Sequence, residues 1–166
     1  MRAGDKASSS NIDSNGKTLS NQQVKYFSES LLRDLNGNLL QLYHGSRYGK
    51  TLEFDMYNGI WVTTSRNYAV KFTYGDNLNV YKVYALGKNI LDIGETNYDY
   101  TDTDLQKLAD KLGVEDDVLL GIAEKVSFDA NPDKMYSIIR SHEFIELAKE
   151  LGYDTIHTVE DGADAY

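Results

Sequence analysis

Residues 38–46 read Asn-Leu-Leu-Gln-Leu-Tyr-His-Gly-Ser, a short apolar run that ends in a histidine and a glycine. The run follows the turn-forming pair Asn36-Gly37, so we predict a buried strand that stops at His44. Gly45 has no Cβ, and its main-chain N–H and C=O can therefore approach a ligand closely. A histidine beside an apolar run is more often a structural residue than a functional one. The pattern alone leaves both roles open for His44.

Apolar and alternating runs predict further strands around this one. The clearest is Asn79–Leu86, where residues alternate between two faces as in a half-buried strand. A loop is expected over residues 49–59, and the only proline, Pro132, lies in a predicted turn. The pair Asp161-Gly162 predicts a tight hairpin turn. The remaining strands are expected at residues 60–63, 89–92, 154–158 and 163–166.

Helical periodicity fills the segments between these strands. Ser20 can cap a short helix whose apolar face holds Val24, Phe27 and Leu31, and Thr64 or Ser65 can cap a second helix. Two acidic helices, broken near Gly113, are expected over residues 103–126, and a further helix runs from about Met135 or Ser141 to Leu151. Strands at both ends of the chain with helices between them predict an α+β fold.

Composition limits the function. The chain has 166 residues, 26 acidic and 17 basic side chains, and a formal net charge of −9. Binding to a nucleic-acid backbone needs clustered Lys and Arg, so we expect no direct nucleic-acid partner. Acidic residues crowd the segment from Asp92 to Asp117, which predicts either a solvated face or a docking surface for a basic partner.

Other features set the expected compartment and organisation. The sequence has no apolar run of 18 residues, no secretory signal pattern and no Cys, so we expect a cytoplasmic protein with no membrane contact. Residues 1–20 are small and polar, which predicts a flexible lead or linker before a domain over residues 21–166. The spacing of His44, His142 and His157 fits no metal-ligand pattern, so no metal is expected.

Several blocks in order resemble the ADP-ribosyltransferase superfamily, in its His-Tyr-Glu type, and in particular the polyvalent-protein domains of phages and bacteria. Leu-Tyr-His-Gly-Ser at residues 42–46 is similar to the first strand of that family. The likeness covers roughly residues 23–166. The later matching blocks are Gly59 to Ser65 with Tyr68-Ala69, Val80 to Leu86, Lys88 to Asp92, and Gly152-Tyr153-Asp154.

The resemblance implies a fold and an activity. The fold would be two small, roughly perpendicular β-sheets with an NAD cleft and a helical segment between strands. The activity would be mono-ADP-ribosylation, in which a glycosyltransferase moves ADP-ribose from NAD to a protein acceptor and releases nicotinamide. Such a protein could serve a phage or a bacterium as an effector, as anti-CRISPR ADP-ribosylating enzymes do. We expect a monomer acting in the cytoplasm of a bacterial host cell.

The resemblance also implies roles for six residues. His44 would contact a ribose hydroxyl, and Gly45 would offer main-chain groups to the nicotinamide amide. Tyr68 would stack on nicotinamide, and Asp164, near the start of the last strand, would be the catalytic carboxylate. Family members more often have Glu at that place, and Glu160 and Asp161 are competing candidates. Ser46 and Ser65 would add polar lining.

Several alternatives remain open from the sequence. The chain could be a pseudo-enzyme that binds NAD or a partner without turnover, or an acidic mimic of nucleic acid that blocks a basic protein. The ending at Tyr166 fits either a fragment of a longer protein or a domain with a short last strand. The arginine-modifying branch of the superfamily is disfavoured, because His44 stands where that branch has Arg and Gly162 stands where a second acid would select the acceptor.

Overall fold

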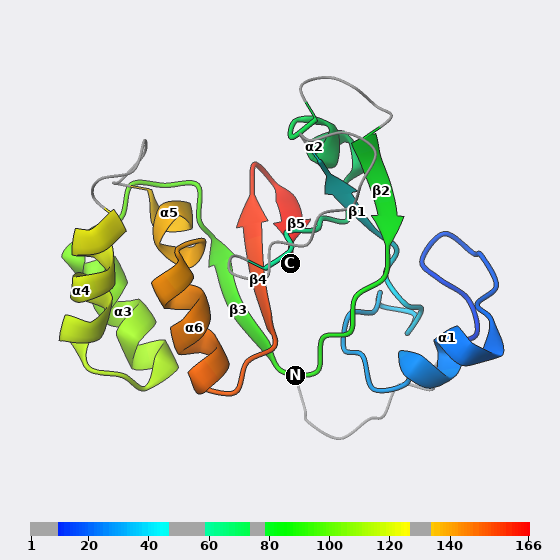
Figure 1. Cartoon of the computed structure of the whole chain (residues 1–166), viewed down its shortest axis with the longest axis horizontal. Coiled ribbons are helices and arrows are strands. Elements are labelled where there is room, and N and C mark those ends of the chain that lie inside the picture. The colour runs from blue at the N-terminus through cyan, green and yellow to red at the C-terminus, as the bar shows by residue number, and fades with distance from the viewer. Residues whose placement is uncertain (1–9, 47–58, 74–78, 127–133) are drawn as a thin grey trace. The chain divides into compact units, whose positions relative to one another are not determined.

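The computed structural model describes residues 10–46, 59–73, 79–126 and 134–166 (Figure 1). Within these ranges the chain forms two compact units. Unit 1 comprises residues 10–46, 62–73 and 79–89, and unit 2 comprises residues 59–61, 90–126 and 134–166. Each unit combines a small sheet with helices, so the predicted α+β class is confirmed. The predicted loop over residues 49–59, apart from Gly59, and the turn at Pro132 lie outside the described residues.

The sheet of unit 1 has two antiparallel strands, β1 (Leu42–Gly45) and β2 (Val80–Val83). Leu42 lies opposite Val83 and Gly45 lies opposite Val80. On the other edge of β1, the N–H and C=O of Tyr43 bond to the C=O and N–H of Thr63 at 2.8 and 2.9 Å. The predicted strand over residues 60–63 is therefore wrong, because only this single bridge forms there.

The predicted first strand is also too long at its start. Leu39, which is buried, forms one bridge with Asp13 and another with Arg33. The main chain before Leu42 thus pairs with the N-terminal segment, and β2 pairs only from Leu42 onward. Long-range pairing of this kind overrides the local strand preference.

Helix α1 (Asn21–Tyr26) begins as predicted. Ser20 accepts a hydrogen bond from the N–H of Gln23, and the Gln23 side chain accepts one from the N–H of Ser20, which completes a capping box. The predicted apolar face is wrong, because α1 ends at Tyr26, buries no residue, and Leu31 is 61% exposed.

Residues 10–20 pack within unit 1, which differs from the flexible lead expected for residues 1–20. Asp13 is buried and accepts hydrogen bonds from the hydroxyl of Tyr84 at 2.7 Å and from the N–H of Lys17 and of Asn15, both at 2.9 Å. Burial alone would raise the pKa of Asp13, but these hydrogen bonds outweigh it and lower the pKa. Burial and the hydrogen bond to Asp13 raise the pKa of Tyr84 to about 12.

Helix α2 (Arg66–Val70) packs on β1 at Gly45. A Cβ atom added to Gly45 would lie 2.0 Å from the main-chain oxygen of Ala69 and 3.2 Å from the Cβ of Phe72. No side chain fits in that space, so glycine is required for α2 to approach the strand.

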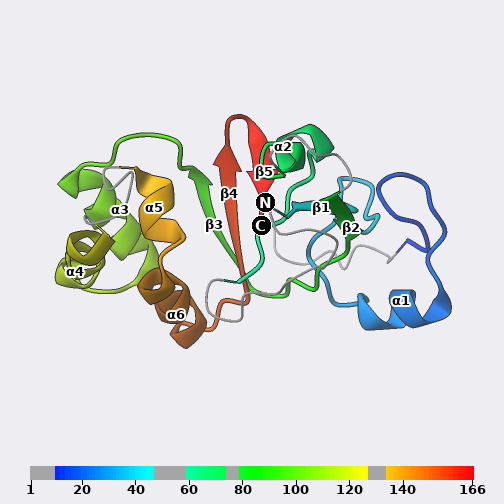
Figure 2. The ribbon, with the colours of Figure 1, turned by 45° about the horizontal axis from the view of Figure 1, so that its top comes forward.

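The sheet of unit 2 has the order β3 (Ile90–Glu95), β4 (Thr155–Glu160), β5 (Ala163–Ala165). Strands β3 and β4 run parallel, and β4 and β5 form an antiparallel hairpin that Figure 2 shows clearly. Its turn has positive φ at both Asp161 (50°) and Gly162 (73°). This is the hairpin turn that the Asp-Gly pair predicted, and the prediction is confirmed.

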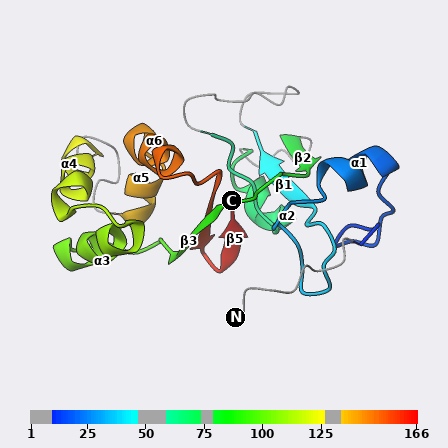
Figure 3. The same cartoon turned by 90° about the horizontal axis from the view of Figure 1, so that it is seen from below.

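Four helices lie to one side of that sheet, as Figures 1 and 3 show. They are α3 (Asp102–Leu112), α4 (Asp116–Val126), α5 (Met135–Ile139) and α6 (His142–Glu150). Gly113, at φ 70°, separates α3 from α4 as predicted. Of the two starts predicted for the helix that ends near Leu151, about Met135 or Ser141, the second is confirmed, because Ser141 caps α6 by accepting a hydrogen bond from the N–H of Phe144. Met135 instead begins the separate short helix α5.

The core of unit 2 forms where these helices meet Leu91 of β3. Its buried members include Leu105, Leu119, Ile138, Ile139 and Phe144, all of them at most 2% exposed. The orientation of the two sheets relative to each other, expected to be perpendicular, stays a prediction.

We predict that Gly45→Ala destabilises the protein by at least about 2 kcal/mol, because the new methyl group must displace the Ala69 carbonyl and with it α2. Urea denaturation measures the change. Gly121→Ala is the matched control, since a Cβ at Gly121 meets no atom within 4 Å. Equal stability of the two variants would contradict the close approach of α2 to β1.

A second prediction concerns the link between Tyr84 and Asp13. Because the pKa of Asp13 is lowered in the folded state, its contribution to stability is present above its ordinary pKa and is lost as the pH falls through the lowered value. Tyr84→Phe should lower stability by about 1–2 kcal/mol at neutral pH and should shift acid unfolding to higher pH. Urea midpoints across the acid range measure both effects. Tyr26→Phe, at an exposed position, should change neither.

Candidate functional site

Three of the predicted site residues, His44, Gly45 and Ser46, lie at the end of β1. Side chains alternate along a strand, and the Cβ position of Gly45 faces Ala69 of α2. His44 therefore points to the side of β1 opposite α2, where it is half-buried. Ser46 is buried, and its N–H donates to the carbonyl of Asn79 at 3.0 Å.

The main chain of Gly45 lies on the edge of β1 that faces away from β2. In an antiparallel ladder hydrogen-bonded pairs alternate, and the bond from Ser46 to Asn79 sets this alternation. The peptide groups of Ser46 and His44 thus face β2, and those of Gly45 and Tyr43 face away from it. Thr63 occupies the edge at Tyr43, and no hydrogen bond joins the Gly45 N–H or C=O to the described residues of unit 1. This edge can bond a ligand amide.

Ser65 caps α2, as the sequence predicted for Thr64 or Ser65. Its hydroxyl oxygen accepts a hydrogen bond from the N–H of Tyr68 at 3.2 Å, and its own N–H donates to the hydroxyl of Thr63 at 3.1 Å. The predicted contact with a ligand stays a prediction, because these bonds explain Ser65 through the helix start alone.

Tyr68 is only 9% exposed. The ring of Phe72 meets its ring edge to face at a centroid distance of 5.3 Å, and the Lys71 Nζ lies 5.0 Å from its centroid. Tyr68 therefore has the environment of a core residue, with little ring surface left for nicotinamide.

Asp164 lies in unit 2, on β5, and its side chain is 49% exposed. It bonds to His157 of β4, whose Nε2 lies 3.2 Å from the Asp164 Oδ1. The other ring nitrogen of His157, Nδ1, lies 2.9 Å from the Oδ1 of Asp92 on β3. Tyr166 stacks on the His157 ring at 4.7 Å. A histidine thus joins two carboxylates across all three strands.

The strand register explains this arrangement. Asp92 lies opposite His157 across the parallel pair, and Asp164 lies opposite Val159 across the hairpin. Because side chains alternate, Asp92, His157 and Asp164 share one face of the sheet. Leu91 and Ile156, on the other face, belong to the core with the helices. Burial, together with the charges of Asp164 and Asp92, raises the pKa of the Tyr166 hydroxyl.

The two competing carboxylates have structural partners. Glu160 is buried and forms an ion pair with Arg140 at 2.7 Å, and the Arg140 guanidinium lies 4.9 Å from the Trp61 ring centroid. Asp161, in the hairpin turn, accepts a hydrogen bond at 2.6 Å from the side-chain amide of Asn97, which follows β3. Of the three acids, Asp164 is the one on the exposed face beside His157.

The sequence did not predict that His157 joins two carboxylates. Its position in an alternating strand indicated which face it shares with Asp164. The link to Asp92 had no sequence signal, because it depends on parallel pairing of segments 65 residues apart.

No family model, curated protein or solved structure matches the chain. In the parts of the chain that the structure describes, no helix combines the length and apolar character needed to cross a membrane. Across those residues, no three His, Cys, Asp or Glu side chains gather as a metal site would require.

We predict measurable coupling between His157 and each of its carboxylate partners. In double-mutant cycles that combine His157→Phe with Asp92→Asn or Asp164→Asn, each pair should show roughly 0.3–1 kcal/mol of interaction energy, because the groups are partly exposed. Phe keeps a ring to stack on Tyr166. Urea denaturation supplies the four stabilities of each cycle, and additive losses would contradict the network. Pairing His157→Phe with Asp154→Asn provides a control cycle.

Proposed function

We propose that this protein is a mono-ADP-ribosyltransferase that moves ADP-ribose from NAD to a protein acceptor and releases nicotinamide. The observation that carries the proposal is the end of β1, where the half-buried His44 is followed by a main-chain edge at Gly45 that no described residue of unit 1 occupies. An amide such as that of nicotinamide can donate to the C=O of Gly45 and accept from its N–H.

The reaction requires few functional groups from the protein. The bond between the ribose C1′ and the nicotinamide nitrogen breaks, and its electron pair neutralises the positive charge on that nitrogen. The leaving group therefore needs no proton, and positive charge grows on the ribose as in glycoside hydrolysis. An acceptor nucleophile then bonds to C1′ and gives up its proton. The protein must orient the ribose and stabilise the developing charge.

In this proposal His44 forms a hydrogen bond with a ribose hydroxyl. Asp164 is the carboxylate whose negative charge stabilises the positive charge that develops on the ribose. The exposure of Asp164, 49% of its side chain, leaves it accessible to a ligand. Its hydrogen bond to His157 orients the carboxylate. Tyr68, assigned to nicotinamide stacking, is the part of the proposal that the structure supports least, because Phe72 and Lys71 already cover its ring.

The biological setting is part of the same proposal. The net charge of −9 favours a basic protein as acceptor. We place the enzyme in the cytoplasm of a bacterial host, as an effector of a phage or bacterium.

A second candidate is a pseudo-enzyme that binds NAD without transfer. The burial of Tyr68 favours it, since the aromatic wall for nicotinamide would be lost while the edge at Gly45 remains. Nicotinamide release separates the two candidates, because only the transferase produces it. A mimic of nucleic acid would bind no NAD.

The proposal predicts distinct effects for His44 and Asp164. With NAD and a bacterial lysate, wild type should release nicotinamide and label a protein. His44→Ala should lower this rate at least roughly tenfold, equivalent to about 1.4 kcal/mol of lost transition-state stabilisation. Asp164→Asn should abolish transfer while calorimetry shows near wild-type NAD binding, and Asp164→Glu should retain or raise activity.

Two control variants carry substitutions of the same residue types outside the proposed site. His142→Ala removes a histidine in unit 2 at the start of α6, and Asp161→Asn keeps a residue that tolerates positive φ in the turn. Both should transfer at the wild-type rate. Normal transfer by folded His44→Ala or Asp164→Asn would contradict the assigned roles, and NAD binding without release by wild type would favour the pseudo-enzyme.

A further inference from the structure

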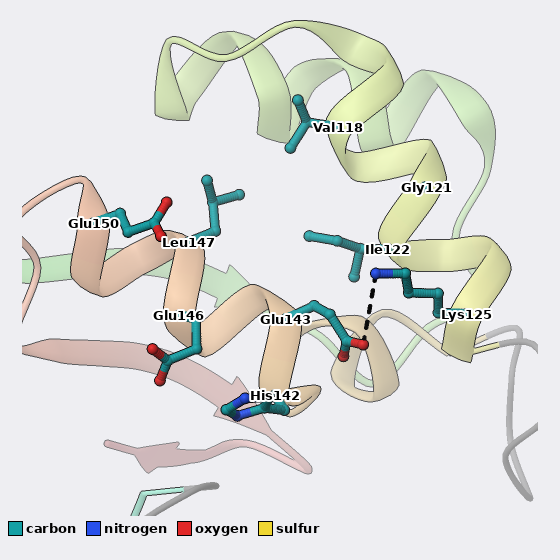
Figure 4. Close-up of a pocket in the computed structure, with 9 residues that line it drawn as sticks. All are labelled: Val118, Gly121, Ile122, Lys125, His142, Glu143, Glu146, Leu147 and Glu150. Carbon is teal, nitrogen blue, oxygen red and sulfur yellow. Dashed lines mark ion pairs between the residues drawn. The ribbon is translucent and has the colours of Figure 1, made fainter.

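A groove runs between α4 and α6 on unit 2 and has a volume of about 430 Å³. Val118 and Ile122 of α4 and Leu147 of α6 point into it, and Lys125 reaches across one end to Glu143 (Figure 4). Its apolar surface is partly open to solvent, because Val118 is 38% exposed. None of the residues assigned to NAD belongs to the lining, which does include the control position His142.

Gly121 of α4 lines this groove. It lies in the middle of α4, where glycine is destabilising relative to alanine. Among the described residues, a Cβ added there would meet no atom within 4 Å, so none of these neighbours requires the glycine. Packing among the described residues of unit 2 therefore gives no reason for Gly121, whereas a ligand that approaches α4 closely would give one.

The rim of the groove is acidic. Glu143, Glu146 and Glu150 follow one another along α6 at spacings of three and four residues, which places them on one side of the helix. Lys125 lies 3.8 Å from Glu143, and Lys149 lies 2.7 Å from Glu146. Surface ion pairs of this kind are weak, so cations of a partner can replace these lysines at little cost.

The helices of unit 2 around the groove also carry a net negative charge. Helices α3, α4 and α6 carry nine carboxylates and four lysines. This excess attracts a basic partner over a longer range than the groove contacts alone. It also disfavours a second copy of this acidic chain as the occupant.

We propose that the groove between α4 and α6 binds an amphipathic basic helix of another protein. The apolar side chains of that helix, at positions i, i+3, i+4 and i+7, would contact mainly the exposed Val118 and the partly buried Leu147, since Ile122 is itself 6% exposed and belongs to the core of unit 2. Its Lys or Arg side chains would pair with the α6 carboxylates. The eleven residues of α4 span about 16 Å, which matches about three turns of a bound helix. This binding is independent of the proposed NAD chemistry.

The test uses a fluorescent synthetic peptide of about three helical turns, with leucine at every third or fourth position and lysine elsewhere. Fluorescence anisotropy should show binding to the full chain that weakens as salt is raised. A peptide with glutamate in place of lysine should not bind. Gly121→Leu, which fills the groove, should weaken binding at least about tenfold, and Glu150→Lys roughly threefold or more.

Matched variants separate binding from folding. Gly121→Ala should raise the midpoint of thermal unfolding by about 2–4 °C, because it removes a mid-helix glycine without a clash. Glu115→Lys changes charge equally but lies between α3 and α4, outside the groove lining, and should bind the peptide like wild type. Wild-type affinity in folded Gly121→Leu, or equal binding of the acidic peptide, would overturn the proposal. Concentration-dependent dimerisation blocked by Gly121→Leu would overturn it in favour of self-association.

Discussion

Unit 1 depends on the contact between Gly45 and the Ala69 carbonyl. Because the space at Gly45 holds no side chain, α2 can lie against the end of β1. The same contact fixes which way the strand faces, and so points His44 to the side opposite α2. One glycine thereby serves packing and, in the proposed function, ligand binding. A Gly45 variant would therefore lose stability as well as any ligand contact, so its activity reports on packing and binding together.

The sequence predicted correctly those helix ends and turns that depend on residues close to one another in the chain. The caps at Ser20 and Ser65, the Asp161-Gly162 turn and the break at Gly113 all follow from residue types that satisfy nearby main-chain groups. Strand extent was predicted less well. Leu39 forms bridges with Asp13, which is far from it in the sequence, and with Arg33, which the chain brings back beside it through a turn. The residue pattern around Leu39 does not indicate either bridge.

The residues of the candidate site differ in the same way in how well the sequence predicts their positions. Those on β1 and at the start of α2 belong to short local motifs, so the sequence predicted which elements carry them. Asp92, His157 and Asp164 come together only because β3 and β4 are parallel and in a specific register. The ion pair of Glu160 with Arg140 likewise depends on tertiary packing. That ion pair gives Glu160 a structural role and leaves Asp164 as the accessible carboxylate on the strand pair.

In the proposed function, the main-chain edge at Gly45 binds the nicotinamide end of NAD. Amide ¹H–¹⁵N correlation spectra of labelled protein, recorded as NAD is added, test it residue by residue. Binding at this edge should give saturable shifts at the Gly45 amide and at its neighbours His44 and Ser46, with nicotinamide alone reproducing the shift at Gly45. An unchanged Gly45 amide at saturating NAD, or shifts confined to other residues, would rule out nicotinamide binding at Gly45.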